Sequence, residues 1–461
     1  MKNLMQRRRF IQTTVAVAAA IGASGMLSKR LMARTQTQHT LLILNPGHFH
    51  AGLTLRSRDP RLADDVYVYA EQGADVDNFI RMVDSFNNRS SDPTQWKLHV
   101  YRGANYLERL RAERRGDIVV ISGKNDVKMA SIQQLHDDGF YVLGDKPWLI
   151  DAADEDKLRQ VAATLPLAMD IMTERHQIAS RLQRALARNS AVFGEYRRDG
   201  NDPAIYFKSV HHLYKIVNNR PLVRPDWFFD TGIQGEGMTD VTTHLVDLAQ
   251  WMTSDGSPFD YQRDVVLEAA QQWPTVVPLD IYSQITGLDA FPAAVRGHVE
   301  DGALQYLCNA GIAYRLRNIP VQIESLWDLK VPDGGGDTHY AVLRGARADL
   351  VVDQGPDTGY LTQLTVRPLR NSAAFKRSLD SAVADLQSEF PGIGCEPDGA
   401  AYRIAIPDAL RTGHESHFGE VLQQFLGYIE AGKWPPQLGP DIVTKYTVLV
   451  RAKQLSHPVT T

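Results

Sequence analysis

The sequence has 461 residues, of which 43% are hydrophobic and 23% charged, and its formal net charge is -4. This composition is typical of a soluble globular protein that is long enough for two domains with separate cores. The slightly acidic balance, without a run of lysine and arginine in the body of the chain, argues against nucleic acid as the main partner.

The first 40 residues have the pattern of a targeting segment. Arginines at positions 7–9 precede an apolar stretch over residues 15–27, and together they resemble a bacterial twin-arginine export signal. The apolar stretch is shorter than the roughly 20 residues that span a bilayer, so we expect no stable membrane span after processing. We predict that residues 1–40 are a signal and that the protein is exported to the periplasm. Twin-arginine export carries folded proteins, which would suit a tightly bound cofactor acquired beforehand.

Strands and helices alternate from residue 41 onward. Apolar runs predict strands at residues 41–44, 66–70, 117–122 and 141–143, with helices at residues 106–113 and 132–138. Such alternation is typical of α/β proteins with a doubly wound parallel sheet, and it predicts a Rossmann-like dinucleotide-binding domain over residues 41–170. Sheets of this kind bind ligands at the carboxyl ends of their strands.

The first turn of this domain departs from the usual dinucleotide fingerprint. The pattern G-x-G-x-x-G would place glycines at positions 45, 47 and 50, whereas the chain has Asn45, Gly47 and His50. Pro46 has no N–H, so one backbone donor to a phosphate is missing. We still expect the turn to contact a cofactor, through Asn45, Gly47, His48, Phe49 and His50.

An acidic residue ends the second predicted strand. Glu71 lies 24 residues beyond Gly47, where a carboxylate that binds the cofactor ribose is expected. A solvent-exposed strand end without a ligand is the alternative. If Glu71 faces the ribose, NAD is favoured over NADP, because the carboxylate would repel a 2'-phosphate.

The pattern changes after residue 170. A helix is predicted at residues 177–187, and alternating apolar positions predict strands over residues 205–212, 303–317 and 340–352, followed by helices at 418–429 and 441–455. Residues 171–461 are therefore expected to form an α+β domain with a large, mostly antiparallel open sheet. The only two cysteines are Cys308 and Cys395, and the sequence does not decide whether they pair.

Residues 235–247 place a carboxylate and an imidazole four positions apart where a helix is expected to begin. Asp240 and His244 would lie on one helical face, which makes them a candidate acid-base pair. Asp240 as a helix N-cap and His244 as a structural histidine are the alternatives. A second candidate is Lys146, which follows the strand at 141–143 and precedes Pro147, so its ammonium can point into the cofactor crevice.

Three segments carry a resemblance to a known family. These segments are residues 117–125, residues 139–147 with their Asp-Lys-Pro end, and the glycine-rich segment that precedes Asp240 and His244. They follow one another in the order found in the glucose-fructose oxidoreductase / inositol dehydrogenase / MocA (Gfo/Idh/MocA) family. After residue 40 the chain resembles this family. It looks most like exported bacterial oxidoreductases with a distinctive C-terminal domain. It departs from the pattern at Asn45, at His50 and at Lys128, where many members have histidine.

The resemblance implies an NAD(P)-dependent oxidoreductase of sugars. Lys146, Asp240 and His244 would meet at the nicotinamide, with His244 as the base that takes a hydroxyl proton. An unperturbed histidine pKa of about 6.5 suits that role. Further cofactor contacts would come from Gly123, Asn125, Asp145, Lys146 and Pro147. The second domain's sheet often forms subunit interfaces in this family, so a homo-oligomer is expected.

The leading hypothesis is hydride transfer between tightly bound NAD and a sugar, polyol or glycoside. Candidate substrate-binding residues are Arg175, His211, His212, Lys215, Arg224 and Trp227, and only one of the two adjacent histidines can face the site if they lie on a strand. One alternative is a glycosidase-like enzyme that uses bound NAD through a transient 3-keto sugar. A second is a protein that binds sugar or metal without nucleotide, motivated by His48, His50, His211, His212, His244 and Asp240. None of their spacings is a recognised metal motif, so no metal is predicted.

Overall fold

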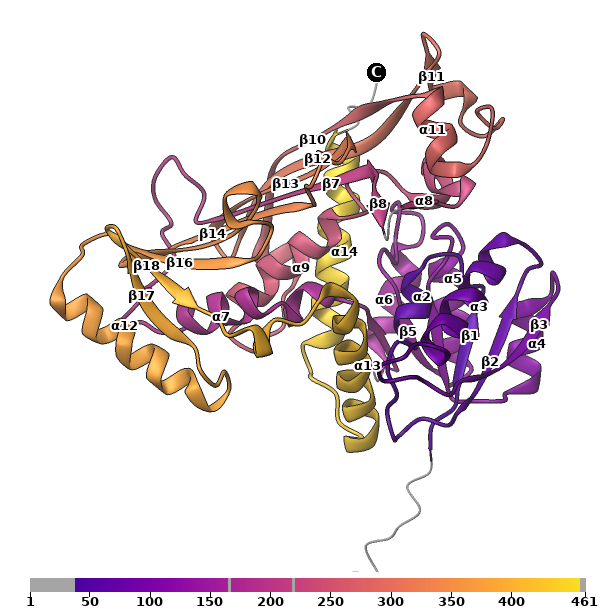
Figure 1. Ribbon diagram of the computed structural model, residues 1–461, viewed down its shortest axis with the longest axis horizontal. Coiled ribbons are helices and arrows are strands. Elements are labelled where there is room, and N and C mark those ends of the chain that lie inside the picture. The colour runs from indigo at the N-terminus through magenta and orange to yellow at the C-terminus, as the bar shows by residue number, and fades with distance from the viewer. Residues whose placement is uncertain (1–37, 165–166, 218–219, 457–461) are drawn as a thin grey trace, which may run out of the picture.

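The structure is a computed structural model that describes residues 38–164, 167–217 and 220–456. The predicted signal at residues 1–40 lies almost wholly outside the described residues. Figure 1 shows an N-terminal α/β unit, in indigo to purple, beside a long sheet that extends away from it. Two C-terminal helices in yellow lie between these parts, so the end of the chain returns to the unit with which it begins.

The N-terminal sheet has six strands in the order β3-β2-β1-β4-β5-β6, and every neighbouring pair is parallel. Its strands are β1 (Leu41–Leu44), β2 (Asp65–Ala70), β3 (Lys97–Arg102), β4 (Ile118–Ile121), β5 (Tyr141–Gly144) and β6 (Ala168–Asp170). Its helices are α2 (His50–Leu53), α3 (Ala74–Asn87), α4 (Tyr106–Glu113), α5 (Lys128–Asp137) and α6 (Glu155–Ala163). The predicted doubly wound parallel sheet is confirmed, and the strand order reverses between β1 and β4, which is where such sheets bind ligands.

The larger sheet has ten strands in the order β10-β12-β13-β7-β14-β15-β16-β18-β17, with β11 beside β12. Its strands are β7 (Ile205–Tyr214), β10 (Val265–Pro278), β11 (Val299–Glu300), β12 (Ala303–Leu316), β13 (Ile319–Lys330), β14 (Thr338–Arg344), β15 (Ala348–Gln354), β16 (Gln363–Pro368), β17 (Gly394–Asp398) and β18 (Ala401–Ala405), and a separate ribbon joins β8 (Ile216–Val217) to β9 (Arg220–Pro221). Only β7 and β13 pair in parallel, so the predicted, mostly antiparallel sheet is confirmed.

The prediction of a single strand over residues 340–352 is wrong. The chain turns back between β14 and β15, whose pairing is antiparallel with Leu343 opposite Leu350. Gly345 sits at this turn, and a Cβ there would lie 2.4 Å from the carbonyl oxygen of Phe193. The close approach of another backbone therefore requires glycine at the turn, and the apolar alternation on both sides of it concealed the break.

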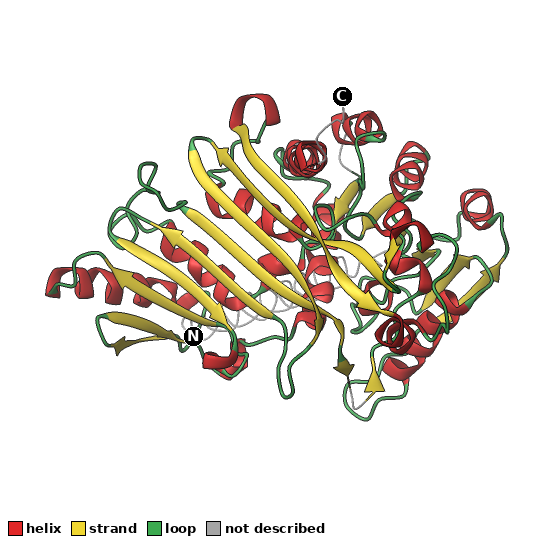
Figure 2. Ribbon diagram, turned by 90° about the horizontal axis from the view of Figure 1, so that it is seen from above, coloured by secondary structure: helices red, strands yellow, loops and turns green. Residues whose placement is uncertain are grey.

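Helices cover one face of the large sheet. In Figure 2 the strands lie in front and the helices behind them, and no described helix covers the front face over most of the sheet. The helices after β6 are α7 (Ile178–Ala187), α8 (Thr231–Gln234), α9 (Thr242–Thr253), α10 (Tyr261–Asp264), α11 (Leu279–Thr286), α12 (Ala373–Asp385), α13 (His414–Ala431) and α14 (Leu438–Ser456), with short 3-10 turns η1 (Thr173–His176), η2 (Asp226–Phe229), η3 (Arg296–His298), η4 (Pro356–Thr358), η5 (Leu386–Ser388) and η6 (Asp408–Leu410). The predicted helices at 177–187, 418–429 and 441–455 are α7, α13 and α14.

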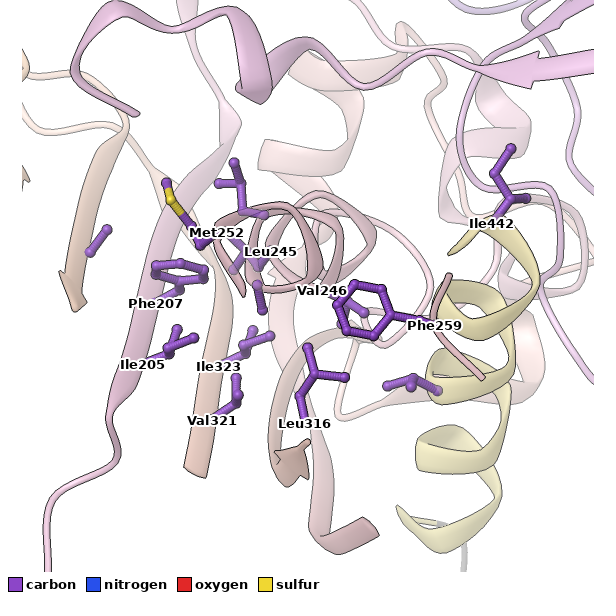
Figure 3. Close-up of a cluster of buried hydrophobic side chains, with 14 of the residues drawn as sticks. Ile205, Phe207, Leu245, Val246, Met252, Phe259, Leu316, Val321, Ile323 and Ile442 are labelled. Atoms are coloured by element: carbon purple, nitrogen blue, oxygen red, sulfur yellow. The ribbon is translucent and has the colours of Figure 1, made fainter. Parts of the chain in front are cut away.

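Helix α9 is anchored by its apolar side. Leu245, Val246 and Met252 point from α9 into a cluster that includes Phe207 of β7 and Ile323 of β13 (Figure 3). All five side chains are at most 4% exposed. Burial of each contributes roughly 1.5–3 kcal/mol relative to exposure. This packing fixes the rotation of α9 and therefore the direction of its polar face, which carries His244.

Helix α13 packs on the first sheet although it belongs to the last part of the chain. Phe418, Leu422 and Phe425 share one buried cluster with Leu41 and Ile43 of β1. Segments from both sides of residue 170 therefore build the N-terminal unit. Cys308 and Cys395 are both free thiols. No helix among the described residues has the length and apolar character needed to cross a membrane.

Candidate active site

A cavity of about 570 Å³ opens between the carboxyl ends of the first sheet and the covered face of the second. It collects most of the side chains that the sequence singled out. The predicted residues that line it are His48, Phe49, His50, Gly123, Asn125, Asp145, Lys146, His211, Lys215, Arg224, Trp227, Asp240 and His244. The size and the convergence of charged groups are those of a small-molecule site.

Lys146 and Asp240 form a buried ion pair in this cavity. Lys146 is the second residue after β5. Its Nζ lies 2.6 Å from Oδ1 of Asp240. The two side chains are 8% and 9% exposed. Burial raises the pKa of Asp240, but the charge and the hydrogen bond of Lys146, together with the nearby imidazoles of His211 and His48, outweigh it, and the net pKa is below the usual value. Asp240 is therefore ionised, and α9 begins after it without a side-chain cap, so the N-cap alternative is wrong.

His244 lines the same cavity from the first turn of α9, but Asp240 bonds Lys146 rather than this imidazole. Nδ1 of His244 is buried and makes no hydrogen bond with any residue that the structure describes. Burial and the Lys146 charge lower the pKa of His244 to about 4. The sequence had suggested a pKa near the unperturbed value. The imidazole is instead neutral at physiological pH, with a lone pair free to accept a proton.

Glu174 is a cavity residue that the sequence analysis missed. It lies in η1, and His414 Nε2 at the start of α13 is 3.7 Å from its carboxylate. Burial raises the pKa of Glu174, but neighbouring histidines, with His414 and His244 first, bring the net pKa below its usual value. The only sequence signal was its position beside Arg175 and the spacing of His414 and His417, which are three residues apart on one helix.

The turn after β1 uses its backbone donors internally. The N–H groups of Gly47 and His48 donate to the carbonyl of Ser122 at 3.0 and 3.1 Å. Gly123 packs so closely on this turn that a Cβ there would lie 2.4 Å from the carbonyl oxygen of Asn45. The turn is therefore locked to the loop after β4, and fewer N–H groups point outward than in a standard phosphate-binding turn.

Trp227 and Asp75 lie over Gly47. The indole Nε1 of Trp227 donates to Oδ2 of Asp75 at 2.9 Å. A Cβ on Gly47 would lie 3.0 Å from Oδ2 of Asp75 and 3.1 Å from the Trp227 ring. Burial raises the pKa of Asp75. The second glycine position of a dinucleotide turn normally faces the pyrophosphate, and here it faces a carboxylate and an indole.

Asp145 gathers the polar groups behind the turn. Its carboxylate lies 3.0 Å from Nδ1 of both His48 and His50 and accepts a hydrogen bond from Ser122 Oγ at 2.8 Å. Lys128 donates to the backbone carbonyl of Asp145 at 3.0 Å. Burial lowers the pKa of Lys128 to about 8. The family departures at His50 and Lys128 thus meet at one buried residue, with His50 at the carboxylate of Asp145 and Lys128 at its backbone carbonyl.

Arg175 and His212 do not line the cavity among the described residues. Arg175 donates two hydrogen bonds to Asp247 at 2.6 and 2.7 Å, and Lys445 also bonds that carboxylate at 2.7 Å. His212 contacts Oδ1 of Asp337 at 3.0 Å, and His211 contacts the other oxygen of that carboxylate at 3.1 Å. The expectation that one of the two adjacent histidines reaches the site is met by His211.

The remaining predicted residues flank the cavity without lining it. Glu71 is exposed at the end of β2, where its carboxylate lies 3.5 Å from Nζ of Lys124 and its N–H donates to Asn45 Oδ1. Asn45, Gly47 and Pro147 are also outside the lining.

Lys215 and Arg224 line the opposite wall of the cavity. Lys215 pairs with Asp337, and Arg224 lies buried over the rings of Phe228 and Trp327.

Two comparisons with known proteins agree with this arrangement. A family described as "Putative oxidoreductase C terminal domain" matches residues 182–457. The crystal structure of a "putative oxidoreductase" from Parabacteroides merdae is similar to this chain, with 37% identity and a TM-score of 0.87. The likeness covers 91% of this chain and 98% of that one.

More distant structures share the fold. KijD10, a 3-ketoreductase from Actinomadura kijaniata solved with NADP, has 12% identity and a TM-score of 0.53, covering 91% of this chain and 97% of that one. GenD2 from gentamicin A biosynthesis, solved with NAD, has 13% identity and a TM-score of 0.55, covering 91% and 94%. No curated protein matches this chain.

Proposed function

Because this chain belongs to the Gfo/Idh/MocA family of oxidoreductases, we propose that it oxidises or reduces a CH–OH group of a sugar, polyol or glycoside with a nicotinamide cofactor. The observation that carries this proposal is the meeting of Lys146, Asp240 and His244 in one cavity. The similar structures solved with NAD or NADP, one of them a 3-ketoreductase, support the choice of a nicotinamide cofactor and of a reaction between a hydroxyl and a keto group.

The residues present fit the nicotinamide end of a dinucleotide. The cavity holds a neutral imidazole, a fixed ammonium and the amide of Asn125, and the Nδ1 of His244 lacks a partner among the described residues. At the other end the pyrophosphate would have to separate Asp75 from Trp227 to approach Gly47. Asn45, Gly47, His48, Phe49, His50 and Gly123 would hold the phosphates, and Asn125, Asp145, Lys146 and Pro147 the nicotinamide side.

Proton transfer follows from the electrostatics of the cavity. When bound, the nicotinamide would accept or supply the hydride. The neutral His244 takes the hydroxyl proton as the alcohol is oxidised, and returns it in the reverse direction. Lys146, held by Asp240, donates a hydrogen bond to the same oxygen while that oxygen carries negative charge. The Lys146 charge also opposes protonation of His244, which keeps the base in its active form at neutral pH.

The first test looks for the nucleotide and then for turnover. Protein made in the cytoplasm is denatured, and the supernatant is examined for released NAD or NADP, with thermal stabilisation by each nucleotide measured in parallel. His244→Ala and Lys146→Ala should retain the nucleotide and lose turnover. Absence of both released nucleotide and stabilisation would refute the redox proposal, and an active His244→Ala enzyme would refute the mechanism.

A second candidate function is redox-neutral cleavage of a glycoside through a transient 3-keto sugar. Glu174 favours it, because this ionised carboxylate in the cavity could take the C–H proton that the ketone acidifies. Such a cleavage leaves the oxidation state of the sugar unchanged overall, so it would proceed without net consumption of a nicotinamide. Sugar release without net cofactor reduction, lost in Glu174→Gln, would identify this reaction, and net reduction would identify a dehydrogenase.

Three further properties are part of the proposal. Residues 7–27 support export to the periplasm with a tightly bound nucleotide. Glu71 supports NAD over NADP, because its exposed carboxylate would repel a 2'-phosphate. The uncovered face of the large sheet, with exposed Val266 and Val276 on β10, supports a homo-oligomer. Light scattering after gel filtration tests the last point, and a monomer at all concentrations would refute it.

A further inference from the structure

Three potential metal ligands meet at the wall of the cavity. Nδ1 of His48 and Nδ1 of His50 each lie 3.0 Å from Oδ2 of Asp145. One ligand atom from each of the three residues lies within 4.8 Å of the others. His50 and Asp145 are buried, whereas the His48 side chain is 23% exposed and faces the cavity. Two imidazoles and a carboxylate are a ligand set that binds divalent transition metals.

The contacts among the three groups suit metal binding. Nδ1 of each imidazole shares a hydrogen bond with the Asp145 carboxylate, which brings the two rings to the same oxygen. Ser122 Oγ donates a hydrogen bond to that carboxylate at 2.8 Å and so orients it. A metal ion would replace the hydrogens that lie between the imidazoles and the carboxylate, so its binding would release protons or shift each imidazole to its other tautomer.

The cluster lies at the turn after β1, where a cation could replace missing backbone hydrogen-bond donors. Pro46 has no N–H, and the N–H groups of Gly47 and His48 already donate to the carbonyl oxygen of Ser122. The backbone of this turn therefore offers few free donors to an anion or to a polarised oxygen of a ligand. A cation held by the side chains of His48, His50 and Asp145 would supply the positive charge that the backbone of the turn does not. The positive charge of Lys146, which is the next residue after Asp145, is offset by its ion pair with Asp240.

We propose that His48, His50 and Asp145 bind one divalent transition metal ion, and that a remaining coordination position faces the cavity and takes an oxygen atom of a ligand. Sites with three protein ligands commonly leave such a position open. The oxygen comes either from a phosphate of a nucleotide or from a hydroxyl or carbonyl of a sugar. The sequence predicted no metal, because Asp145 lies 95 residues from His50 and no local spacing reveals the set.

The test uses untagged full-length protein that has been dialysed against a chelator. Co²⁺ is titrated while its visible absorption is recorded, and metal content is measured after gel filtration. We expect about one bound ion per chain. His48→Gln and Asp145→Asn should each weaken binding at least about tenfold. The matched control is His99→Gln, because His99 also contacts a carboxylate, that of Asp65 at 2.7 Å, but lies exposed on β3.

The outcomes are separable from those of the redox proposal. Wild-type protein without bound Co²⁺, or a His48→Gln variant that binds as tightly as His99→Gln, would overturn the metal site. Asp145→Asn is interpreted only if its melting curve is cooperative, and the partly exposed His48, whose side chain faces the cavity, provides the variant that should fold in any case. His244→Ala should keep the metal and lose turnover. A change of the Co²⁺ spectrum with NAD identifies a phosphate ligand, a change with sugars identifies a hydroxyl or carbonyl, and no change with either would refute the open position.

Discussion

The ammonium of Lys146 lies 2.6 Å from the carboxylate of Asp240, across 94 residues of sequence. Lys146 follows the fifth strand of the first sheet, and Asp240 precedes the helix that is anchored in the second. The pair therefore joins the two parts of the molecule at the point where the chemistry is proposed. Its two roles, structural and catalytic, can be separated by substitution.

Removal of one partner should cost more stability than removal of both. Lys146→Met or Asp240→Asn leaves the other group buried without its partner, and each should lower the free energy of unfolding by about 3–5 kcal/mol. The double variant Lys146→Met/Asp240→Leu should recover most of this loss and remain inactive. Urea denaturation followed by circular dichroism measures the difference. Lys157→Met serves as control, because its partner Asp154 forms a surface pair worth less than about 1 kcal/mol. Additive single effects would contradict the interpretation.

The acid limb of the pH profile should lie well below that of an ordinary histidine. In the proposed mechanism His244 acts as the base only when neutral, and burial lowers its pKa to about 4. The value of kcat/KM for the oxidation should therefore stay nearly constant as pH falls from 7 to roughly 5.5, and should decline as pH approaches the pKa of His244. Initial rates with circular dichroism at each pH separate this loss from acid unfolding. A midpoint near 6.5, the unperturbed value, would show that His244 is not buried as described.

Asp75→Asn should tighten nucleotide binding. A carboxylate a few ångströms from a phosphate in a partly buried site opposes binding by about 1–3 kcal/mol, which corresponds to roughly a ten- to hundred-fold change in Kd. Asp77→Asn is the control, because Asp77 lies on the same helix but pairs with Arg102. Calorimetric titration above pH 7 gives both constants. Equal affinity of Asp75→Asn and wild type would mean that the nucleotide does not pass over Gly47.

Arg175→Met should reduce stability and leave substrate binding unchanged. Arg175 and Lys445 neutralise the buried Asp247, and loss of one cation leaves that carboxylate with half of its compensation. We expect a loss of about 3–5 kcal/mol in the free energy of unfolding, with KM of the folded enzyme preserved. Arg181→Met, which removes a surface pair with Glu389, should be nearly silent. A large increase in KM without a change of melting temperature would restore Arg175 to the substrate site.

The sequence was informative where local pattern and topology act together. Lys146 could be placed because a buried strand precedes it, and parallel strands bring their carboxyl ends to one edge. For His211 and His212 the sequence predicted only that one of them faces the site, because neighbouring side chains on a strand point to opposite faces. The pattern does not show which face of the strand borders the cavity, so it could not select His211. The weakly apolar edge strand β3 was missed, because most of its side chains are exposed or half-exposed and it lacks a buried run.

Contacts between distant segments could not be predicted. Glu174 and His414 are 240 residues apart, and only the packing of α13 against the first sheet brings them together. Arg175 was assigned to the substrate because its type suits sugar hydroxyls, yet the position of Asp247 on α9 turns it toward an ion pair. Periodicity gives the buried side of each helix, but it does not give the partner that this side meets.

The packing of α13 also sets an order on synthesis. Leu41 and Ile43 leave the ribosome early, whereas Phe418 and Phe425, which cover the same cluster, leave it almost last. Until then this apolar layer of the first sheet is covered only in part, by α2 and α3, so an early-terminated chain that contains all six strands of that sheet would expose apolar surface. Only a chain translated nearly to its end could complete this cluster and bring His414, which also lies on α13, to the wall of the cavity.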